Sequence, residues 1–373
     1  MGYAGSIVRR GLSVLLLSGL LAGCATRPGP DLLMPASAPS DARLTRVMVA
    51  TNRERAAPDS NVFTTQRAPA LNFAEFTIAT PQRQNPDGTA TALGGADMNH
   101  NFITVDQDVL TKTEFTQRVS PRTIGRKNVF IYVHGFNTNF QEALFRLVQL
   151  SADARAEGTP ILFAWPSQAR VTGYAADRET VVLSRDQLAE FLTTLAANPR
   201  IGRITIVAHS LGGALTVEAL ERLRLAGKRS VISRLNILLV SPDIDAEAFR
   251  QQVAVIGPLS PPMMVLVAPD DRALAISRRL AGSRTRVGAL DVNDPRVREA
   301  ALRARVRIVD VSSMSATSRF NHDRHVNLAA IYSIVAAETV DDPEIDRSNP
   351  GVFVLSASFG NLFAVTDRTH PAQ

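Results

Sequence analysis

One short stretch, residues 203–220, constrains the fold of this chain more than any other. A β-branched run, Ile-Thr-Ile-Val at 204–207, has the length and composition of a buried strand in a parallel sheet. From Ala214 onward the apolar spacing becomes that of a helix, which we expect to continue to Leu225 and to end at Gly227. The stretch therefore predicts a strand, a tight turn and a helix in immediate succession.

The turn between strand and helix reads Ala-His-Ser-Leu-Gly-Gly over residues 208–213. A chain that passes from strand to helix in so few residues strains the backbone of the central residue. The small residues Ala208 and Gly212 make such a turn sterically possible, and the strain exposes the hydroxyl of Ser210 above the sheet. Short turns of this kind also occur for structural reasons alone, so the assignment of Ser210 as a nucleophile needs support from the rest of the chain.

Strand-like and helical patterns alternate along most of the sequence. We expect strands over 46–50, 73–80, 128–133, 161–164, 236–240, 264–268 and 306–311, and helices over 140–156, 178–197 and 326–337. The first two strands are expected to begin the sheet in antiparallel pairing. The alternation predicts an α/β fold, with a mostly parallel central sheet and helices on both faces. Such sheets bind ligands beyond the carboxyl ends of their strands.

A serine hydroxyl is a weak nucleophile at neutral pH, so it needs a base, and the base needs a group that orients it. His322 and His325 follow the last core strand, and Asp270 and Asp271 follow the strand before it. Serine, aspartate and histidine in this order along the chain match one of the known orders of a catalytic triad. His209 is expected to point away from the serine hydroxyl and to be structural.

Several further motifs share a resemblance with one family. They are VATNRER at 49–55, YVHGFN at 132–137, FAWPSQ at 163–168, AHSLGG at 208–213, SPDID at 241–245 and DDRALAISRRL at 270–280. With them the chain resembles the α/β-hydrolases, specifically a bacterial esterase/lipase-like group of unknown function that has lipoprotein members. The resemblance covers roughly residues 44–340. It implies an α/β-hydrolase fold and a serine hydrolase that cleaves carboxylic esters through an acyl-enzyme, without a metal or an organic cofactor.

Carried over by position, the resemblance assigns Ser210 as the nucleophile and Asp271 as the acid, and it leaves Asp270 as the alternative acid. His322 is the expected base because of its spacing to the final helix, and His325 is the alternative. The resemblance thus implies a Ser-His-Asp triad.

The oxyanion that forms when a serine attacks an acyl carbonyl needs backbone N–H donors. Leu211 follows the nucleophile at the start of a helix, and Phe136 lies in the loop after the HGFN strand, so we expect their N–H groups to form the oxyanion hole. Trp165 and Tyr174 are candidates for lining the substrate pocket. Asp243 is a weaker alternative for the acid.

Two other functions stay open at this point. The same triad attacks any acyl carbonyl, so a thioesterase or an amidase fits the residues as well as an esterase does. A catalytically silent hydrolase fold could also serve as a binding module anchored in the cell envelope.

The first 24 residues have the order of a bacterial lipoprotein signal peptide. A pair of arginines precedes an apolar run over residues 12–21, which is too short to span a bilayer comfortably. Residues 21–24, Leu-Ala-Gly-Cys, resemble a lipobox, in which the cysteine is acylated and becomes the first mature residue. The resemblance implies that residues 1–23 are removed and that Cys24 carries a lipid anchor. Cys24 is the only cysteine, so no disulfide can form within the chain.

Ala25 stands where an aspartate would favour the inner membrane, so we expect the outer membrane, facing the periplasm. Residues 24–43 are rich in proline, serine and alanine and are expected to form a flexible tether. The catalytic domain is expected over 44–340. The tail, residues 341–373, is expected to add an edge strand or to be disordered.

The charge pattern excludes one class of partner. The net charge is +6, but the arginines are scattered, without blocks and without interleaved aromatic residues. A nucleic-acid partner is therefore not expected. The expected partners are a small-molecule or lipid ester and the membrane that holds the anchor, while the sequence leaves the oligomeric state open.

Overall fold

The structure is a computed structural model, and it describes residues 27–80, 102–120, 125–153, 158–280, 282, 284–312, 322 and 352–354. Cys24, His325, most of the C-terminal tail and the helix expected over 326–337 lie outside the described residues.

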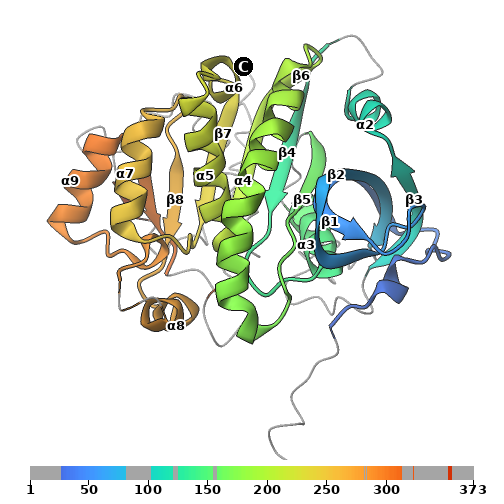
Figure 1. Ribbon diagram of the computed structural model, residues 1–373, viewed down its shortest axis with the longest axis horizontal. Helices are drawn as coiled ribbons and strands as arrows, with labels where there is room; N and C mark the ends of the chain where they lie inside the picture. The colour runs from blue at the N-terminus through green and yellow to red at the C-terminus, as the bar shows by residue number, and fades with distance from the viewer. Residues whose placement is uncertain are drawn as a thin grey trace, which may run out of the picture.

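The described residues include ten strands that form a single sheet, in the order β10-β9-β8-β7-β6-β4-β5-β1-β2-β3 (Figure 1). The strands are β1 (Arg43–Arg55), β2 (Phe63–Thr80), β3 (Ile103–Leu110), β4 (Lys127–Val133), β5 (Thr159–Ala164), β6 (Ile201–His209), β7 (Leu235–Val240), β8 (Met264–Val267), β9 (Arg307–Asp310) and β10 (Val352–Val354). The eight strands β10, β9, β8, β7, β6, β4, β5 and β1 each run parallel to their neighbours in this series. At the other end of the sheet, β2 is antiparallel to β1 and to β3. The expected mostly parallel sheet with an antiparallel start is confirmed.

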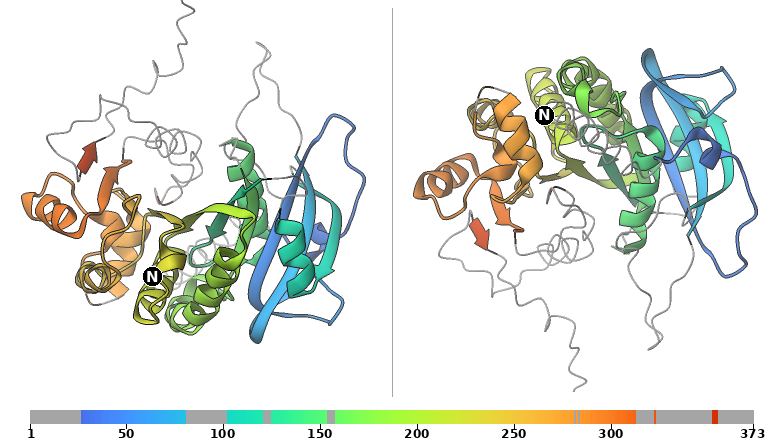
Figure 2. Two further views of the ribbon diagram at one scale, coloured as in Figure 1. Left: turned by 90° about the horizontal axis from the view of Figure 1, so that it is seen from above. Right: turned by 90° about the horizontal axis from the view of Figure 1, so that it is seen from below.

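Helices cover both faces of the sheet (Figure 2). The α-helices are α2 (Lys112–Val119), α3 (Phe140–Asp153), α4 (Tyr174–Ala197), α5 (Leu211–Leu225), α6 (Arg229–Ile232), α7 (Ala246–Ile256), α8 (Arg272–Leu280) and α9 (Pro295–Ala304), and the short 3-10 helices are η1 (Pro30–Leu33), η2 (Val171–Gly173) and η3 (Val287–Ala289). Side chains of α4, α5 and α7 share one apolar cluster with the sheet, and those of α3 share another on the opposite face. The parallel strands end at the lower edge of the sheet in Figure 1, near α8; we call this the carboxyl edge.

The antiparallel end of the sheet is larger than the sequence indicates. β3 and α2 were not expected, and β2 begins at Phe63, well before the expected start at residue 73. β3 reads Ile-Thr-Val-Asp-Gln-Asp-Val-Leu, whose polar side chains suit an edge strand with one face toward water. Thr111 begins α2 with a capping box, in which its side chain accepts from Glu114 N–H and the Glu114 side chain accepts from Thr111 N–H.

The segment expected to be a flexible tether is partly packed on the domain. Leu33 in η1 is 1% exposed and lies in the same apolar cluster as the side chains of α3. Thr104 Oγ1 donates a hydrogen bond of 2.7 Å to Leu32 O, and Gln107 Nε2 donates one of 2.9 Å to Leu33 O. The expectation of a flexible tether is therefore wrong for residues 27–36, because an apolar side chain and backbone hydrogen bonds fix this part of the segment.

Arg27, the first described residue, lies at the carboxyl edge. Its guanidinium donates hydrogen bonds to Glu142 and to the backbone oxygens of Asn137 and Ala169. Asn137 follows β4 and Ala169 follows β5, so Arg27 joins two loops of this edge. No helix among the described residues is both long and apolar enough to cross a membrane.

The only described part of the C-terminal tail is β10, which pairs in parallel with β9 at the edge of the sheet. The domain boundaries that we expect from the sequence otherwise remain a prediction.

Candidate active site

The turn between β6 and α5 has the strained backbone that the sequence predicts, but Ser210 is only 3% exposed, so the expected exposure of its side chain is wrong. Ser210 has φ 53° and ψ −120°, a conformation that is rare for a residue other than glycine. Hydrogen bonds hold the turn on both sides: Ser210 N donates to Val240 O at 3.0 Å, and Gly213 N donates to Ser210 O at 3.0 Å. The helix begins at Leu211, three residues before the position that the apolar spacing indicates.

Two glycines allow the turn to pack against β4 and the loop that follows it. A Cβ atom on Gly212 would lie 2.4 Å from the carbonyl oxygens of both Val133 and His134, so no side chain fits there. A Cβ atom on Gly135 would lie 3.0 Å from Ser210 Cβ and closer still to His209. The HGFN loop therefore lies directly against the Ser210 turn.

Asp271 and His322 lie close together, although 51 residues separate them. His322 Nδ1 is 2.6 Å from Asp271 Oδ2, with the carboxylate side chain fully buried and the imidazole 19% exposed. The other carboxylate oxygen, Asp271 Oδ1, accepts a hydrogen bond of 3.0 Å from Leu274 N in the first turn of α8. One carboxylate thus caps a helix and contacts a histidine at the same time.

Asp270 differs from its neighbour in burial, because it is exposed where Asp271 is only 2% exposed. The sequence predicts that the carboxylate not facing the histidine caps the following helix. The structure assigns this cap to Asp271 instead, since Leu274 N donates to it.

His209 has a role that the sequence does not reveal. Its Nε2 lies 3.1 Å from the backbone oxygen of His322, and the two imidazole rings are 4.6 Å apart between centroids. Because His209 directly precedes Ser210, this contact brings His322 to the Ser210 turn. No sequence signal distinguishes it from an ordinary structural histidine, because its partner is more than a hundred residues away.

His134 and Trp165 are fully buried and stacked, with ring centroids 5.0 Å apart. Trp165 Nε1 donates a hydrogen bond of 2.7 Å to His134 O, and the ring nitrogens of His134 face backbone oxygens of Gly135 and Trp165. Burial, and secondarily the charge of Arg53, lowers the pKa of His134 to about 3, while the two facing carbonyl oxygens act in the opposite direction. Both residues support the loops of the carboxyl edge, and Trp165 packs there instead of lining a pocket.

Arg53, from the VATNRER motif, is buried and forms hydrogen bonds with the loops after β4 and β5. Its guanidinium donates to Thr138 O at 3.1 Å and to Ser167 O at 3.4 Å. Burial lowers the pKa of Arg53 to about 10, which leaves the side chain charged near neutral pH. Asp177, whose pKa burial raises, accepts hydrogen bonds from Ser167 Oγ and Gln168 N at 2.5 and 2.7 Å.

Asp243, the weaker alternative for the acid, belongs to a different network. Arg286 Nε lies 3.2 Å from Asp243 Oδ1, and both side chains are almost completely buried. Tyr174 and Ser277 donate their hydroxyl hydrogens to the same carboxylate, at 2.9 and 2.6 Å. Asp243 N also donates to Ser210 O at 3.2 Å, so the network joins α8 to the Ser210 turn.

Ser277 lies in the DDRALAISRRL motif, so the sequence draws attention to it. Arg286 lies in no motif, and nothing in the sequence distinguishes it from the many other arginines of the chain. The carboxylate of Asp243 is occupied by these partners, and the acid candidate in contact with His322 is Asp271. Asp245, two residues further on, caps α7 by accepting from Glu247 N and Ala248 N.

The two candidate oxyanion-hole residues both lie next to the Ser210 turn. Leu211 is the first residue of α5, and the first N–H groups of a helix have no partner within the helix. Phe136 follows Gly135, which packs on Ser210, and its ring meets the ring of Tyr174 edge to face at 5.3 Å between centroids.

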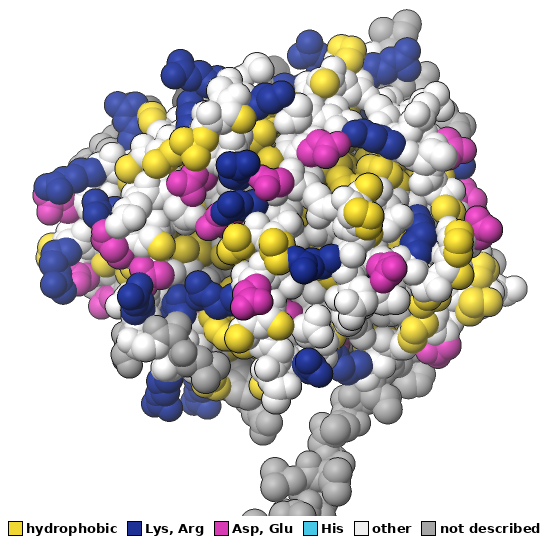
Figure 3. All heavy atoms as spheres, viewed as in Figure 1, with side chains coloured by type: hydrophobic (Ala, Val, Ile, Leu, Met, Phe, Trp, Pro, Cys, Tyr) yellow, Lys and Arg dark blue, Asp and Glu magenta, His cyan; other side chains and the backbone are white. Residues whose placement is uncertain are grey.

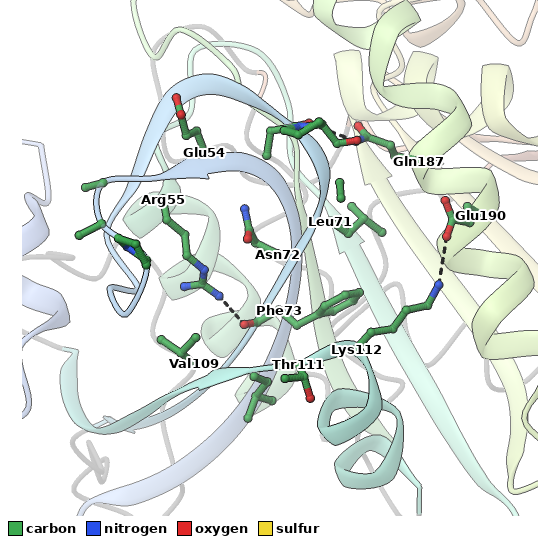
Figure 4. Close-up of a pocket in the computed structure, with 17 residues that line it drawn as sticks. Glu54, Arg55, Leu71, Asn72, Phe73, Val109, Thr111, Lys112, Gln187 and Glu190 are labelled. Carbon is green, nitrogen blue, oxygen red and sulfur yellow. Dashed lines mark hydrogen bonds and ion pairs between the residues drawn. The ribbon is translucent and has the colours of Figure 1, made fainter.

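A separate pocket of about 870 Å³ lies between β1, β2, α2 and α4 (Figure 4). Lys112 and Glu190 form an ion pair of 3.0 Å beside it, and Arg55 donates to Phe73 O within it. None of the candidate site residues lines this pocket. Within the described ranges, no group of three or more histidine, cysteine or acidic side chains is placed to hold a metal ion.

Comparison with known proteins gives weak structural likenesses and one family. No curated protein matches the chain. Among solved structures, esterase Est22 is 14% identical over 91% of this chain and 87% of its own, with a TM-score of 0.38. Est1E from Butyrivibrio proteoclasticus is 12% identical over 60% of this chain and 93% of its own, with a TM-score of 0.34. An uncharacterized protein from Bacillus cereus is 10% identical over 61% of this chain and 66% of its own, with a TM-score of 0.36.

TM-scores this low support no argument about function. The match to a family model is extensive by contrast, and it covers residues 109–338, which is more than half of the chain. The protein therefore belongs to the family described as "Alpha/beta hydrolase of unknown function (DUF900)".

Proposed function

We propose that this α/β-hydrolase cleaves carboxylic esters with Ser210 as nucleophile, His322 as base and Asp271 as acid. The observation that carries the proposal is the 2.6 Å contact between His322 Nδ1 and Asp271 Oδ2. It is supported by the contact of His209 with His322, because His209 adjoins Ser210 in the chain.

The proposed reaction follows from the chemistry of these groups. A carboxylate accepts a hydrogen bond, so Asp271 favours the imidazole tautomer with its proton on Nδ1, which leaves Nε2 of His322 free of a proton. That nitrogen takes the proton of Ser210 as its oxygen attacks the acyl carbonyl, and Asp271 stabilises the imidazolium that forms. The proton then passes to the leaving alcohol, and water repeats the sequence on the acyl-enzyme.

The negative charge of the tetrahedral intermediate would be stabilised by the N–H groups of Phe136 and Leu211. The packing of Gly135 against Ser210 supports this assignment, because it holds the Phe136 loop beside the nucleophile. One such donor typically contributes about 3 kcal/mol to transition-state stabilisation. No metal or organic cofactor is required by this mechanism.

The ester as substrate rests on the resemblance of the sequence motifs to esterase/lipase-like hydrolases. Thioesters and amides have the same electrophilic carbonyl, so the leaving group is the property that a substrate panel must vary. Matched 4-nitrophenyl ester, thioester and anilide substrates with the same acyl chain compare these leaving groups directly.

We further propose that the protein is a lipoprotein, anchored through Cys24 in the outer membrane and facing the periplasm. The order of basic residues, apolar run and lipobox in residues 1–24 supports this proposal. The catalytic domain is proposed to span residues 44–340, and its expected partners are an ester substrate and the membrane.

Asp271→Asn is expected to lower kcat for a 4-nitrophenyl ester by about 10⁴-fold with a near-normal melting temperature. The asparagine oxygen can still cap α8, but its amide group cannot hold the correct imidazole tautomer. Asp271→Ala should lose the same activity and also about 1 kcal/mol of stability, because the cap is lost as well. Asp270→Asn, the matched control, should stay within a few-fold of wild type; activity lost there and retained in Asp271→Asn would make Asp270 the acid.

His322→Ala is expected to lower kcat by roughly 10⁴-fold or more, because the nucleophile loses its base, while thermal stability changes little. His325→Ala serves as the matched control and should cost far less activity. Steady-state kinetics and melting curves of both variants are the measurement. The reverse result would move the base to His325 and leave the acid to be reassigned.

Cys24→Ser is expected to release the protein from the membrane fraction or to leave the precursor uncleaved, because no acyl chain can be attached to serine. Ala25→Ser keeps the cysteine and should behave like the natural chain. The measurement is membrane fractionation and intact mass of the natural chain, Cys24→Ser and Ala25→Ser. If Cys24→Ser has an unchanged mass and stays in the membrane fraction, the lipid anchor is ruled out.

A further inference from the structure

Two large apolar side chains at the carboxyl edge are exposed to solvent. Val171, in η2 after β5, is 75% exposed, which is the highest value among the large apolar side chains that the structure describes. Ile276, in α8 after β8, is 47% exposed. Exposed apolar groups of this size are normal when single, so their arrangement decides whether they matter.

The elements that carry these two side chains are linked by a hydrogen bond. Tyr174 directly follows η2, and its hydroxyl lies 2.7 Å from Ser277 Oγ, next to Ile276 in α8. The contact fixes η2 beside α8 although about a hundred residues separate them. Val171 and Ile276 therefore extend from neighbouring elements at the same edge of the sheet.

α8 is amphipathic in a way that adds positive charge to this surface. Its inward side chains, Leu274 and Ser277, are buried. Its exposed face carries the following residues at helical spacing: Arg272, Ala275, Ile276 and Arg279. Arginines on both sides of an apolar side chain are typical of helices that lie in the surface of a membrane.

Further arginines flank the same surface. Arg170 precedes Val171 and Arg278 lies beside Arg279, and both are exposed. Asp270 is exposed at the start of α8 and offsets part of this charge. In Figure 3 several of the dark-blue Lys and Arg side chains on the visible face lie at the lower left of the molecule, where α8 lies.

The N-terminal end of the described chain reaches the same edge. Arg27 donates a hydrogen bond to the backbone oxygen of Ala169, the residue before Arg170. Cys24 precedes Arg27 by three residues, which span at most about 11 Å when fully extended. If Cys24 carries the proposed lipid anchor, on which this step rests, the lipid would hold this edge close to the bilayer.

We propose that Arg170, Val171, Arg272, Ile276, Arg278 and Arg279 form a docking surface for an anionic lipid bilayer, so that the side of the protein that carries Ser210 faces the membrane. The apolar side chains enter the headgroup region, and the arginines bind lipid phosphates. Charge complementarity and the place where the chain approaches Cys24 both favour a lipid surface as the occupant. The proposal concerns binding and orientation, so it stands or falls independently of the esterase reaction.

The position of Val171 at a membrane can be measured because Cys24 is the only cysteine. In the full chain with Cys24→Ser, we would introduce Val171→Cys and attach an environment-sensitive fluorophore such as NBD. The matched control is Leu225→Cys, a 66% exposed position at the end of α5, at the opposite edge of the sheet. Both proteins are mixed with vesicles of phosphatidylglycerol and phosphatidylethanolamine, and with vesicles of phosphatidylcholine alone.

The label at Val171 should shift to the blue and brighten on the anionic vesicles, and the label at Leu225 should not. An equal response at both positions, or no response at Val171, would overturn the proposal. The vesicles need no substrate, so an inactive enzyme that gives the expected shift would separate this inference from the proposed function.

The contribution of charge is tested in the chain labelled at Val171. Arg278→Gln with Arg279→Gln should raise the lipid concentration at half-maximal shift by about 30-fold, since each arginine near an anionic surface contributes about a factor of five. Lys228→Gln with Arg229→Gln removes the same charge from exposed positions at the start of α6, at the opposite edge, and should change little. Equal effects of the two pairs would show that net charge, and not this surface, determines binding.

Discussion

The arrangement of the carboxyl edge depends on how closely α5 approaches β4. At Gly212 the helix backbone lies so near the carbonyl oxygens of Val133 and His134 that a single methyl group would not fit. This approach allows β6 to turn into α5 within one residue, and that residue, Ser210, takes a positive φ that costs of order 1–3 kcal/mol. Such strain persists only where the surroundings determine the turn, and two hydrogen bonds do so here: Ser210 N donates to Val240 O, and Gly213 N donates to Ser210 O.

Around this turn the protein uses buried polar groups to hold loops that come from distant parts of the sequence. Arg53 joins the loops after β4 and β5, and Asp243, which is paired with Arg286, joins Ser277 of α8 to the Ser210 turn. Buried charges are costly unless they are paired and hydrogen-bonded, so such groups fix one arrangement of their neighbours. The motifs VATNRER and FAWPSQ thus serve mainly to support the site, while Ser210, Asp271 and His322 are the groups proposed to react.

The sequence predicts those features that depend on local chemistry. The strand, the tight turn at Ser210 and the helix after it follow from short patterns, whereas the choice of Asp271 over Asp270 as the acid is implied by the family resemblance and stays a prediction. The contact between His209 and His322, and the burial of Arg286, depend on residues brought together by the fold, so no local pattern reveals them. β3 escapes prediction because its polar side chains hide the strand period, and Leu33 anchors a segment whose composition resembles a linker.

The most direct test of the account is whether the hydroxyl of Ser210 is an activated nucleophile. The folded protein would be treated with a fluorophosphonate probe at neutral pH, digested, and mapped by mass spectrometry. The account predicts a single modified peptide that contains Ser210, with labelling lost in Ser210→Ala although that variant melts like the natural protein. Absence of labelling in the folded protein, or equal labelling of Ser210→Ala, would contradict it.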